Sequence, residues 1–160
     1  MLYGIELPSR GGNTIFANMV AAWDSLPPSL RQQLEHCRAV NVYDYDNAAT
    51  QRSESVRADS PRASHPVART HPATGRKALY VNPGFALRFE GWSADDSRPL
   101  LEHLYRHATK PEFTCRFRWR EGSIAFWDNR ATWHYAANDY QGERRLMHRI
   151  TIAGCELAAA

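Results

Sequence analysis

The chain has 160 residues, of which 43% are apolar and 23% charged, so it is long enough to bury the core of one soluble globular domain. Its apolar runs are too short for a membrane-spanning helix, and Met1 to Pro8 resemble no secretory signal. A net charge of +3 is too weak to indicate nucleic-acid binding, and three scattered cysteines form no CxxC pair or disulfide framework. These features predict a cytoplasmic protein with no membrane or nucleic-acid partner.

The first half of the chain is expected to combine short strands with two short helices. A Gly-Gly turn, a Pro-Pro break and local periodicity predict four segments: extended residues 1–16 with a turn at Gly11-Gly12-Asn13, helices over 17–25 and 29–37, and a strand over 39–45. Residues 46–64 are polar and almost free of large apolar side chains. They are therefore expected to form a mobile loop of the kind that often serves as a lid.

The second half is expected to contain one long helix and a series of strands. Residues 95–109 have one apolar face, Ser93 as the helix cap and two aspartates in the first turn. Short strands are predicted over 77–82, 113–119, 124–127, 132–136 and 145–152. Together they predict a mainly β fold with flanking helices, an antiparallel sandwich or jelly roll.

Arginines alternate with apolar side chains in the strand predicted over residues 113–119. We interpret the basic stripe of Arg116, Arg118 and Arg120 as a solvated strand face. No aromatic residue shares that face, as a stacking platform for nucleic-acid bases would require. A nucleic-acid-binding domain is therefore the least favoured class of function for this chain.

The densest cluster of residues that could carry function surrounds His134 and Arg145. These two residues lie in two predicted strands joined by a turn at 138–143. A hairpin would place these strands side by side, about 5 Å apart. Arg145 and Arg149 are four residues apart, so both are expected on one face of their strand. A metal-binding imidazole beside two guanidinium groups suits a dianionic cosubstrate and an anionic substrate, because arginine binds carboxylates and sulfonates through paired hydrogen bonds.

Five motifs follow one another in a recognisable order: Gly11-Gly-Asn-Thr14, His65-Pro-Val-Ala-Arg-Thr-His-Pro72, Tyr80-Val-Asn-Pro-Gly-Phe85, Trp127-Asp-Asn-Arg-Ala-Thr-Trp-His-Tyr135 and Arg144-Arg-Leu-Met-His-Arg149. In this order they closely resemble the taurine dioxygenase (TauD/TfdA) family of iron(II)/2-oxoglutarate-dependent dioxygenases. The resemblance covers nearly the whole chain. It implies a double-stranded β-helix, which is a cupin-like jelly roll with flanking helices.

The resemblance also implies roles for five residues. His134 matches the distal iron-binding histidine, Arg145 the arginine that pairs with the distal carboxylate of 2-oxoglutarate, and Thr14 the threonine that supports the same carboxylate. Arg149 matches the arginine that holds the anionic group of the substrate, and Phe85 an aromatic residue of the substrate pocket. The family uses Fe(II), 2-oxoglutarate and O2 to hydroxylate small anions such as taurine, other sulfonates and aryloxy or carboxylic acids, and it releases succinate and CO2.

One departure from the family pattern concerns the iron ligands. The family takes its other two ligands from a His-x-Asp motif that precedes the Gly-Gly-x-Thr turn, and none of the seven histidines here has Asp or Glu two residues later. The resemblance therefore implies that residues 1–160 are an N-terminally truncated TauD/TfdA-like domain. Such a chain is expected to be inactive alone and to expose apolar sheet edges that favour homo-oligomers. The alternative function is an inactive remnant or an organic-anion-binding module without redox chemistry.

Each candidate residue also has a structural alternative. His134 would be a hydrogen-bonded core histidine, Arg145 and Arg149 a solvated strand face, Thr14 a turn-stabilising residue, and Phe85 part of the core. Three further polar residues are expected to be structural, namely Asp128 in its turn and the proline neighbours His65 and His71.

Overall fold

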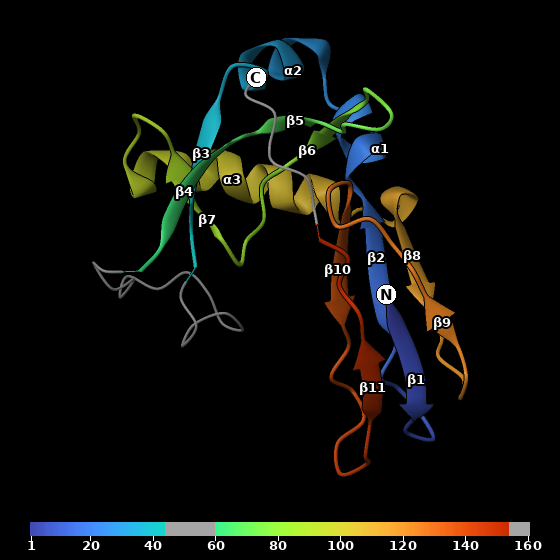
Figure 1. Cartoon of the computed structure of the whole chain (residues 1–160). Helices are drawn as coiled ribbons and strands as arrows, with labels where there is room; N and C mark the ends of the chain where they lie inside the picture. Colours follow the sequence, from blue (N-terminus) through green and yellow to red (C-terminus); the bar gives the residue numbers. More distant parts are fainter. Residues whose placement is uncertain (44–59, 154–160) are drawn as a thin grey trace.

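The computed structural model describes residues 1–43 and 60–153, which form short strands with flanking helices (Figure 1). The elements of the first half are β1 (Leu2–Glu6), β2 (Thr14–Asn18), α1 (Met19–Asp24), α2 (Pro28–Leu34), β3 (Arg38–Val42), β4 (Arg62–Pro66), β5 (Ala68–Thr70) and β6 (Lys77–Leu79). Those of the second half are β7 (Ala86–Phe89), α3 (Ala94–Ala108), the 3-10 helix η1 (Pro111–Phe113), β8 (Thr114–Phe117), β9 (Ile124–Ala125), β10 (Thr132–Ala136) and β11 (Leu146–Arg149).

The described strands form four small sheets, and all their pairings are antiparallel. Two sheets, with strand orders β11-β1-β9 and β10-β2-β8, lie together on one side of the molecule (Figure 1). On the other side the sheet β4-β3-β7 packs along α3, and the β5-β6 hairpin lies next to α1. This arrangement confirms the expected mainly β fold with flanking helices.

Local sequence determines where the helices begin. The Asn18 side chain accepts hydrogen bonds from the backbone N–H groups of Val20 and Ala21, so it caps α1. The helix predicted over 17–25 therefore starts two residues late, because β2 continues to Asn18 through its pairing with β10. The Ser93 hydroxyl caps α3 by accepting from the N–H of Asp96, as predicted.

Two predictions about the middle of the chain need correction. Part of the loop expected over 46–64 is strand β4, because Arg62–Pro66 pairs with β3; residues 46–59 of that loop lie outside the described residues. The segment Ala86–Phe89, for which no strand was predicted, is β7 and pairs with the other edge of β3. Both strands are short and lack clean alternation, so pairing with β3 rather than local pattern explains them.

The predicted hairpin between the strands of His134 and Arg145 is wrong. His134 lies on β10, which pairs with β2, whereas β11 pairs with β1 in the other sheet. Arg145 itself precedes β11 and belongs to the connection between the two strands. The turn at 138–143 therefore carries the chain from one sheet to the other, a crossing that a local turn signal does not reveal.

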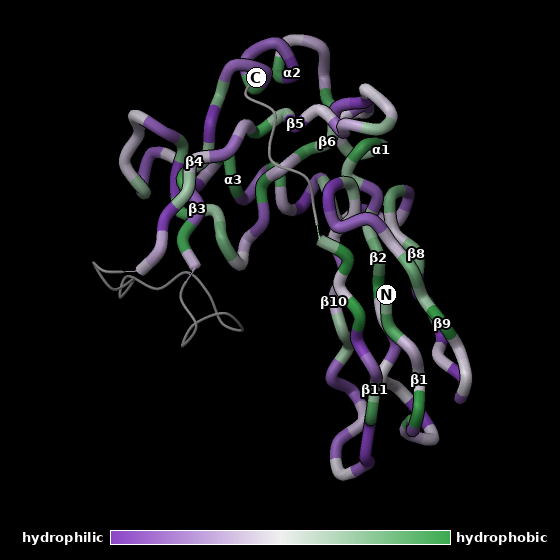
Figure 2. The backbone as a smooth tube through the Cα atoms, viewed as in Figure 1, coloured by the Kyte–Doolittle hydropathy of each residue, from purple (hydrophilic) through white to green (hydrophobic). Residues whose placement is uncertain are grey.

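The hydrophobic core lies around α1 and α3. Its largest buried side chains are Phe89, Met19, Leu34, Leu79 and Leu104. By contrast, Tyr3 of β1 is 42% exposed and its pairing partner Ile124 of β9 is 59% exposed. Figure 2 shows apolar stretches along the strands on this side. An exposed apolar sheet surface was expected; the self-association expected from it stays a prediction. No helix in residues 1–43 or 60–153 is long and apolar enough to cross a membrane.

Candidate active site

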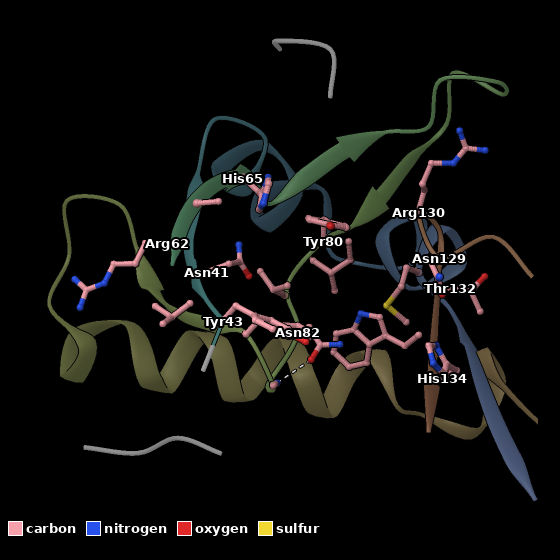
Figure 3. A pocket seen from close by; sticks show the side chains of 18 of the residues that line it. Asn41, Tyr43, Arg62, His65, Tyr80, Asn82, Asn129, Arg130, Thr132 and His134 are labelled. Atoms are coloured by element: carbon pink, nitrogen blue, oxygen red, sulfur yellow. Dashed lines mark hydrogen bonds between the residues drawn. The ribbon is translucent and has the colours of Figure 1, made fainter. Parts of the chain in front are cut away.

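A cavity of about 720 Å³ opens between β3, β4 and β10 (Figure 3). His134 of β10 lies at one end of it, and Asn41 of β3 and His65 of β4 lie at the other. Tyr80 and Asn82 line the space between these ends. The cavity is therefore built from segments that are far apart in the sequence, with a candidate metal ligand at one end.

Aromatic rings form much of the cavity wall. Tyr43 and Phe85 are stacked, with ring centroids 5.7 Å apart and planes at 14°. His65 meets the edge of Tyr80 at a centroid distance of 5.6 Å, and Trp133 adds a ring from β10. An apolar wall with a few polar groups is typical of a pocket for a small organic molecule. Phe85 and His134 thus line one cavity.

His134 sits in an aromatic environment on β10. Its ring lies 5.0 Å from Trp127, centroid to centroid, and Trp127 lies 5.0 Å from Phe16 of β2. The residue keeps exposed surface, but desolvation by its surroundings lowers the pKa of His134. Desolvation thus favours the neutral imidazole, which is the form that ligates a metal ion.

A second group of side chains surrounds Trp119, just after β8. The indole Nε1 of Trp119 donates a hydrogen bond to the Thr14 hydroxyl at 2.9 Å. The guanidinium carbon of Arg145 lies 5.9 Å from the centre of the Trp119 ring, and its Nε donates to the carbonyl oxygen of Gly12 at 3.2 Å. Thr14 and Arg145, which are 131 residues apart in the chain, thus meet at one indole.

Both Thr14 and Arg145 keep hydrogen-bonding capacity that the described residues do not use. The Nη2 of Arg145 is buried and has no hydrogen-bond partner there. The Thr14 hydroxyl is 1% exposed and accepts from Trp119, so its own proton remains available for donation. A buried donor without a partner costs about 1–3 kcal/mol, and more when it is charged. Such a group marks a position suited to a bound anion.

The register of the sheet β10-β2-β8 places Thr14 and His134 on the same face. Thr14 pairs with Ala136, and Phe16 pairs with His134. Alternate residues of a strand point to the same side, so Thr14 and His134 are diagonal neighbours. Diagonal neighbours in an antiparallel pair lie roughly 7–8 Å apart. Thr14, which belongs to the cluster around Trp119, and the candidate metal ligand His134 therefore share one side of one sheet.

Arg149 belongs to neither group. It lies on β11 opposite Leu2 of β1, where it is exposed, and it does not line the cavity. The strand face that it was expected to share with Arg145 is not formed, because Arg145 lies outside the strand. Of the predicted site residues, the structure groups Thr14 with Arg145 and His134 with Phe85, and leaves Arg149 apart.

The described residues do not complete a metal centre on His134. Across 1–43 and 60–153, no three His, Cys, Asp or Glu side chains lie close enough together to hold a metal ion. The iron site that the resemblance implies needs two imidazoles and one carboxylate. An iron ion therefore does not fit His134 with these residues alone, whereas a carboxylate fits the unpaired nitrogen of Arg145.

The carboxylate of Asp128, six residues before His134, is already engaged. Asp128 accepts hydrogen bonds from Arg130 Nε at 2.8 Å and lies 2.9 Å from the Nε2 of His71. Hydrogen bonds from Arg130 hold the pKa of Asp128 well below its usual range; burial opposes this effect and the His71 contact adds to it. Asp128 and His71 are thus structural, as expected, whereas His65 lines the cavity.

Sequence reasoning missed Trp119 and the polar cavity residues Asn41 and Asn82. Asn82 lies inside the Tyr80–Phe85 motif, so that motif already contained a signal for it. Trp119 looked like one more apolar member of an alternating strand, and Asn41 like a polar position in another. Their roles come from neighbours distant in sequence, which local patterns do not show.

Known proteins of one class are similar to this chain in sequence and in fold. The chain is 40% identical over 164 aligned residues to an alpha-ketoglutarate-dependent sulfate ester dioxygenase from Pseudomonas putida, with 96% of this chain and 54% of the relative covered. It is 37% identical over 163 residues to an alpha-ketoglutarate-dependent 2,4-dichlorophenoxyacetate dioxygenase from Burkholderia sp. (strain RASC), covering 99% of this chain and 54% of that protein.

Solved structures agree with these relatives. The structure of AAD-2 in complex with Mn(II) and N-oxalylglycine matches with a TM-score of 0.87 at 31% identity, covering 99% of this chain and 64% of that one. A taurine dioxygenase from Burkholderia xenovorans matches with a TM-score of 0.80 at 37% identity, covering 91% and 48%. The fold is thus that of the jelly-roll dioxygenases that use alpha-ketoglutarate, which is 2-oxoglutarate.

The family assignment follows from the sequence as a whole. Residues 1–151 match the family described as "Taurine catabolism dioxygenase TauD, TfdA family", and the chain belongs to this family. It spans about half the length of the curated relatives it matches.

Proposed function

We propose that this chain acts in an iron(II)/2-oxoglutarate-dependent dioxygenase that hydroxylates a small organic anion, such as taurine, another sulfonate, or an aryloxy or carboxylic acid. The observation that carries the proposal is the buried Nη2 of Arg145, which has no partner among the described residues and lies in the cluster that contains the Thr14 hydroxyl. Iron(II) and O2 would supply the oxidising chemistry, with conversion of 2-oxoglutarate to succinate and CO2, and His134 would be one of the iron ligands.

In this proposal Arg145 and Thr14 bind the distal carboxylate of 2-oxoglutarate. The guanidinium supplies a charge-assisted hydrogen bond from Nη2, and the hydroxyl of Thr14 supplies a second from its free proton. His134, on the same sheet face, contributes one iron ligand. Phe85 contacts the substrate within the cavity. The assignment of Arg149 to the anionic group of the substrate rests on its motif match alone, because Arg149 lies on β11 and does not line the cavity.

A second candidate function is an organic-anion-binding module without redox chemistry. One observation favours it, namely that the described part of the chain holds no group of three metal-ligating side chains. In that case the same two residues, Arg145 and Thr14, would bind a carboxylate, and His134 would be a packed aromatic-cluster residue.

The coupling between iron and 2-oxoglutarate tests the two functions against each other. 2-Oxoglutarate is titrated into the chain without oxygen, with and without iron(II), and the titrations are repeated with His134→Ala. If His134 ligates iron next to the cosubstrate, iron(II) tightens 2-oxoglutarate binding in the parent chain and not in the variant, because coupled ligands strengthen each other. Binding that is equal with and without iron would show that this chain holds no iron next to the cosubstrate, and it would favour the anion-binding module.

A further inference from the structure

We propose that Asp139 is a positioning residue for Arg145 and acts through the Gly11-Gly12 turn. This inference rests on the proposed function, since it concerns how the anion-binding arginine is oriented. A carboxylate oxygen of Asp139 accepts a hydrogen bond from the Gly12 N–H at 2.7 Å. The carbonyl oxygen of the same glycine accepts from Arg145 Nε at 3.2 Å. Gly12 therefore connects the Asp139 carboxylate to the guanidinium group.

The turn fits between these two side chains only because it consists of glycine. Gly11 and Gly12 have φ values of 75° and 63°, in the left-handed region that other residues rarely adopt. A Cβ on Gly11 would lie 2.6 Å from the Asp139 carboxylate, and one on Gly12 would lie 3.3 Å from Arg145 Cδ and 3.4 Å from its Nε. The backbone of the turn is thus in close contact with Asp139 on one side and Arg145 on the other.

The bond from Asp139 is needed because Gly12 is buried. Its N–H has no water to donate to, and an ionised carboxylate is a stronger acceptor than a neutral oxygen. Two consecutive glycines provide little conformational restraint of their own. Without Asp139 the Gly12 carbonyl loses its fixed position, and Arg145 Nε loses a fixed acceptor. The nearby Trp119 ring, 5.9 Å from the guanidinium carbon, does not define the direction in which Nη2 points.

Glu143 offers a matched control in the same connection between β10 and β11. Its carboxylate accepts from the Ser9 N–H at 2.6 Å and from the Ser9 hydroxyl at 3.0 Å. Glu143 therefore links the same two loops, residues 7–13 and 137–145, without contacting Gly12. Replacing either acid removes one negative charge and one loop contact. Only the replacement of Asp139 changes the turn that holds Arg145.

The experiment compares the full chain with Asp139→Ala, Asp139→Asn and Glu143→Ala. Two quantities are measured: the affinity for 2-oxoglutarate by calorimetry, and the ¹⁵N–¹H resonance of Arg145 Nε, assigned with Arg145→Lys. We expect Asp139→Ala to weaken binding about tenfold, the scale of one charge-assisted hydrogen bond, and to shift the resonance. Asp139→Asn keeps an acceptor oxygen, so it retains most of the affinity, with a smaller shift. Glu143→Ala changes neither quantity.

Each remaining outcome decides between explanations. If Asp139→Ala and Glu143→Ala weaken binding equally and the resonance stays in place, the positioning role is wrong. Tighter binding in Asp139→Ala would show that Asp139 acts only through charge repulsion, which also overturns the proposal. If the parent chain does not bind 2-oxoglutarate but Asp139→Ala shifts the resonance, the proposed function fails while the positioning role stands. If Asp139→Ala does not fold, an unshifted resonance in Asp139→Asn overturns the role.

Discussion

Replacing Arg145 with methionine is expected to weaken 2-oxoglutarate binding strongly and to leave the stability of the fold nearly unchanged. The unbranched methionine side chain fills similar space but carries no charge. The substitution removes the hydrogen bond from Arg145 Nε to Gly12, about 1.5–3 kcal/mol for a charged donor. It also removes the contact with the Trp119 ring, worth about 0.5–1 kcal/mol.

The same substitution relieves a cost that the parent chain carries. The Nη2 of Arg145 is a buried charged donor without a partner among the described residues, which costs about 1–3 kcal/mol or more. The losses and the relief nearly offset each other, so the free energy of unfolding is expected to change by less than about 2 kcal/mol. The bound carboxylate, however, loses its charged partner, which costs about 2–5 kcal/mol, a factor between roughly 30 and 4,000 in affinity.

Urea unfolding and calorimetric titration of 2-oxoglutarate measure the two effects on the same samples. Arg116→Met serves as the control, because Arg116 is an exposed arginine on β8 and its loss is expected to change neither quantity by much. A large loss of stability in Arg145→Met with unchanged affinity would refute the reasoning. Arg145 would then be a structural residue, and its unpaired nitrogen would have no role in binding.

Three further predictions concern other parts of the chain. Arg149→Ala is expected to leave 2-oxoglutarate affinity within about twofold, because Arg149 lies outside the Arg145 cluster. It is expected to weaken taurine binding, because its motif match assigns it to the anionic group of the substrate; equal loss of both in titrations would reassign it to the cosubstrate or to folding. The pKa of Asp128 is held below its usual range, so its contribution to stability is present above about pH 4 and is lost as the pH falls further. Asp128→Asn should therefore lower the thermal midpoint at neutral pH and flatten its decrease in acid; parallel acid profiles would contradict this. Phe89→Ala is expected to destabilise the chain by about 3–5 kcal/mol in urea unfolding, because Phe89 is fully buried; a loss below about 1 kcal/mol would show that its site is not tightly packed.

The elements predicted most accurately are those that local chemistry defines. Ser93 caps α3, and Pro28 is the first residue of α2. Both signals depend on a few adjacent residues. The boundary between β2 and α1 was misplaced because the pairing of Ala17 with Trp133 extends the strand, and that partner is more than one hundred residues away. Strand β7 was missed for the same reason, since its pairing with β3 and not its own sequence defines it.

The candidate site shows a similar division. The order of the motifs led to Thr14, Arg145 and His134, and the structure brings the first two together and places the third on the same face. One part of the prediction was wrong, because it brought His134 and Arg145 together through a hairpin between their strands. The actual link is Thr14, which neighbours His134 through the β2–β10 register and meets Arg145 at Trp119. A tryptophan in an alternating strand carries no local sign of such a contact.

The unpaired nitrogen of Arg145 also explains how this fold could bind a carboxylate without rearranging. A guanidinium group in solvent would have to give up its water and select one orientation when the ligand arrives. Here burial has already removed the water, and the contacts with Gly12 and Trp119 restrict the side chain before any ligand is present. The folded chain has therefore already desolvated and oriented the guanidinium group. Ligand binding does not have to supply that free energy, so the affinity reflects more of the charge-assisted hydrogen bond. The same reasoning predicts why Arg145→Met separates stability from binding, since it removes the unfavourable buried donor and the anion partner together.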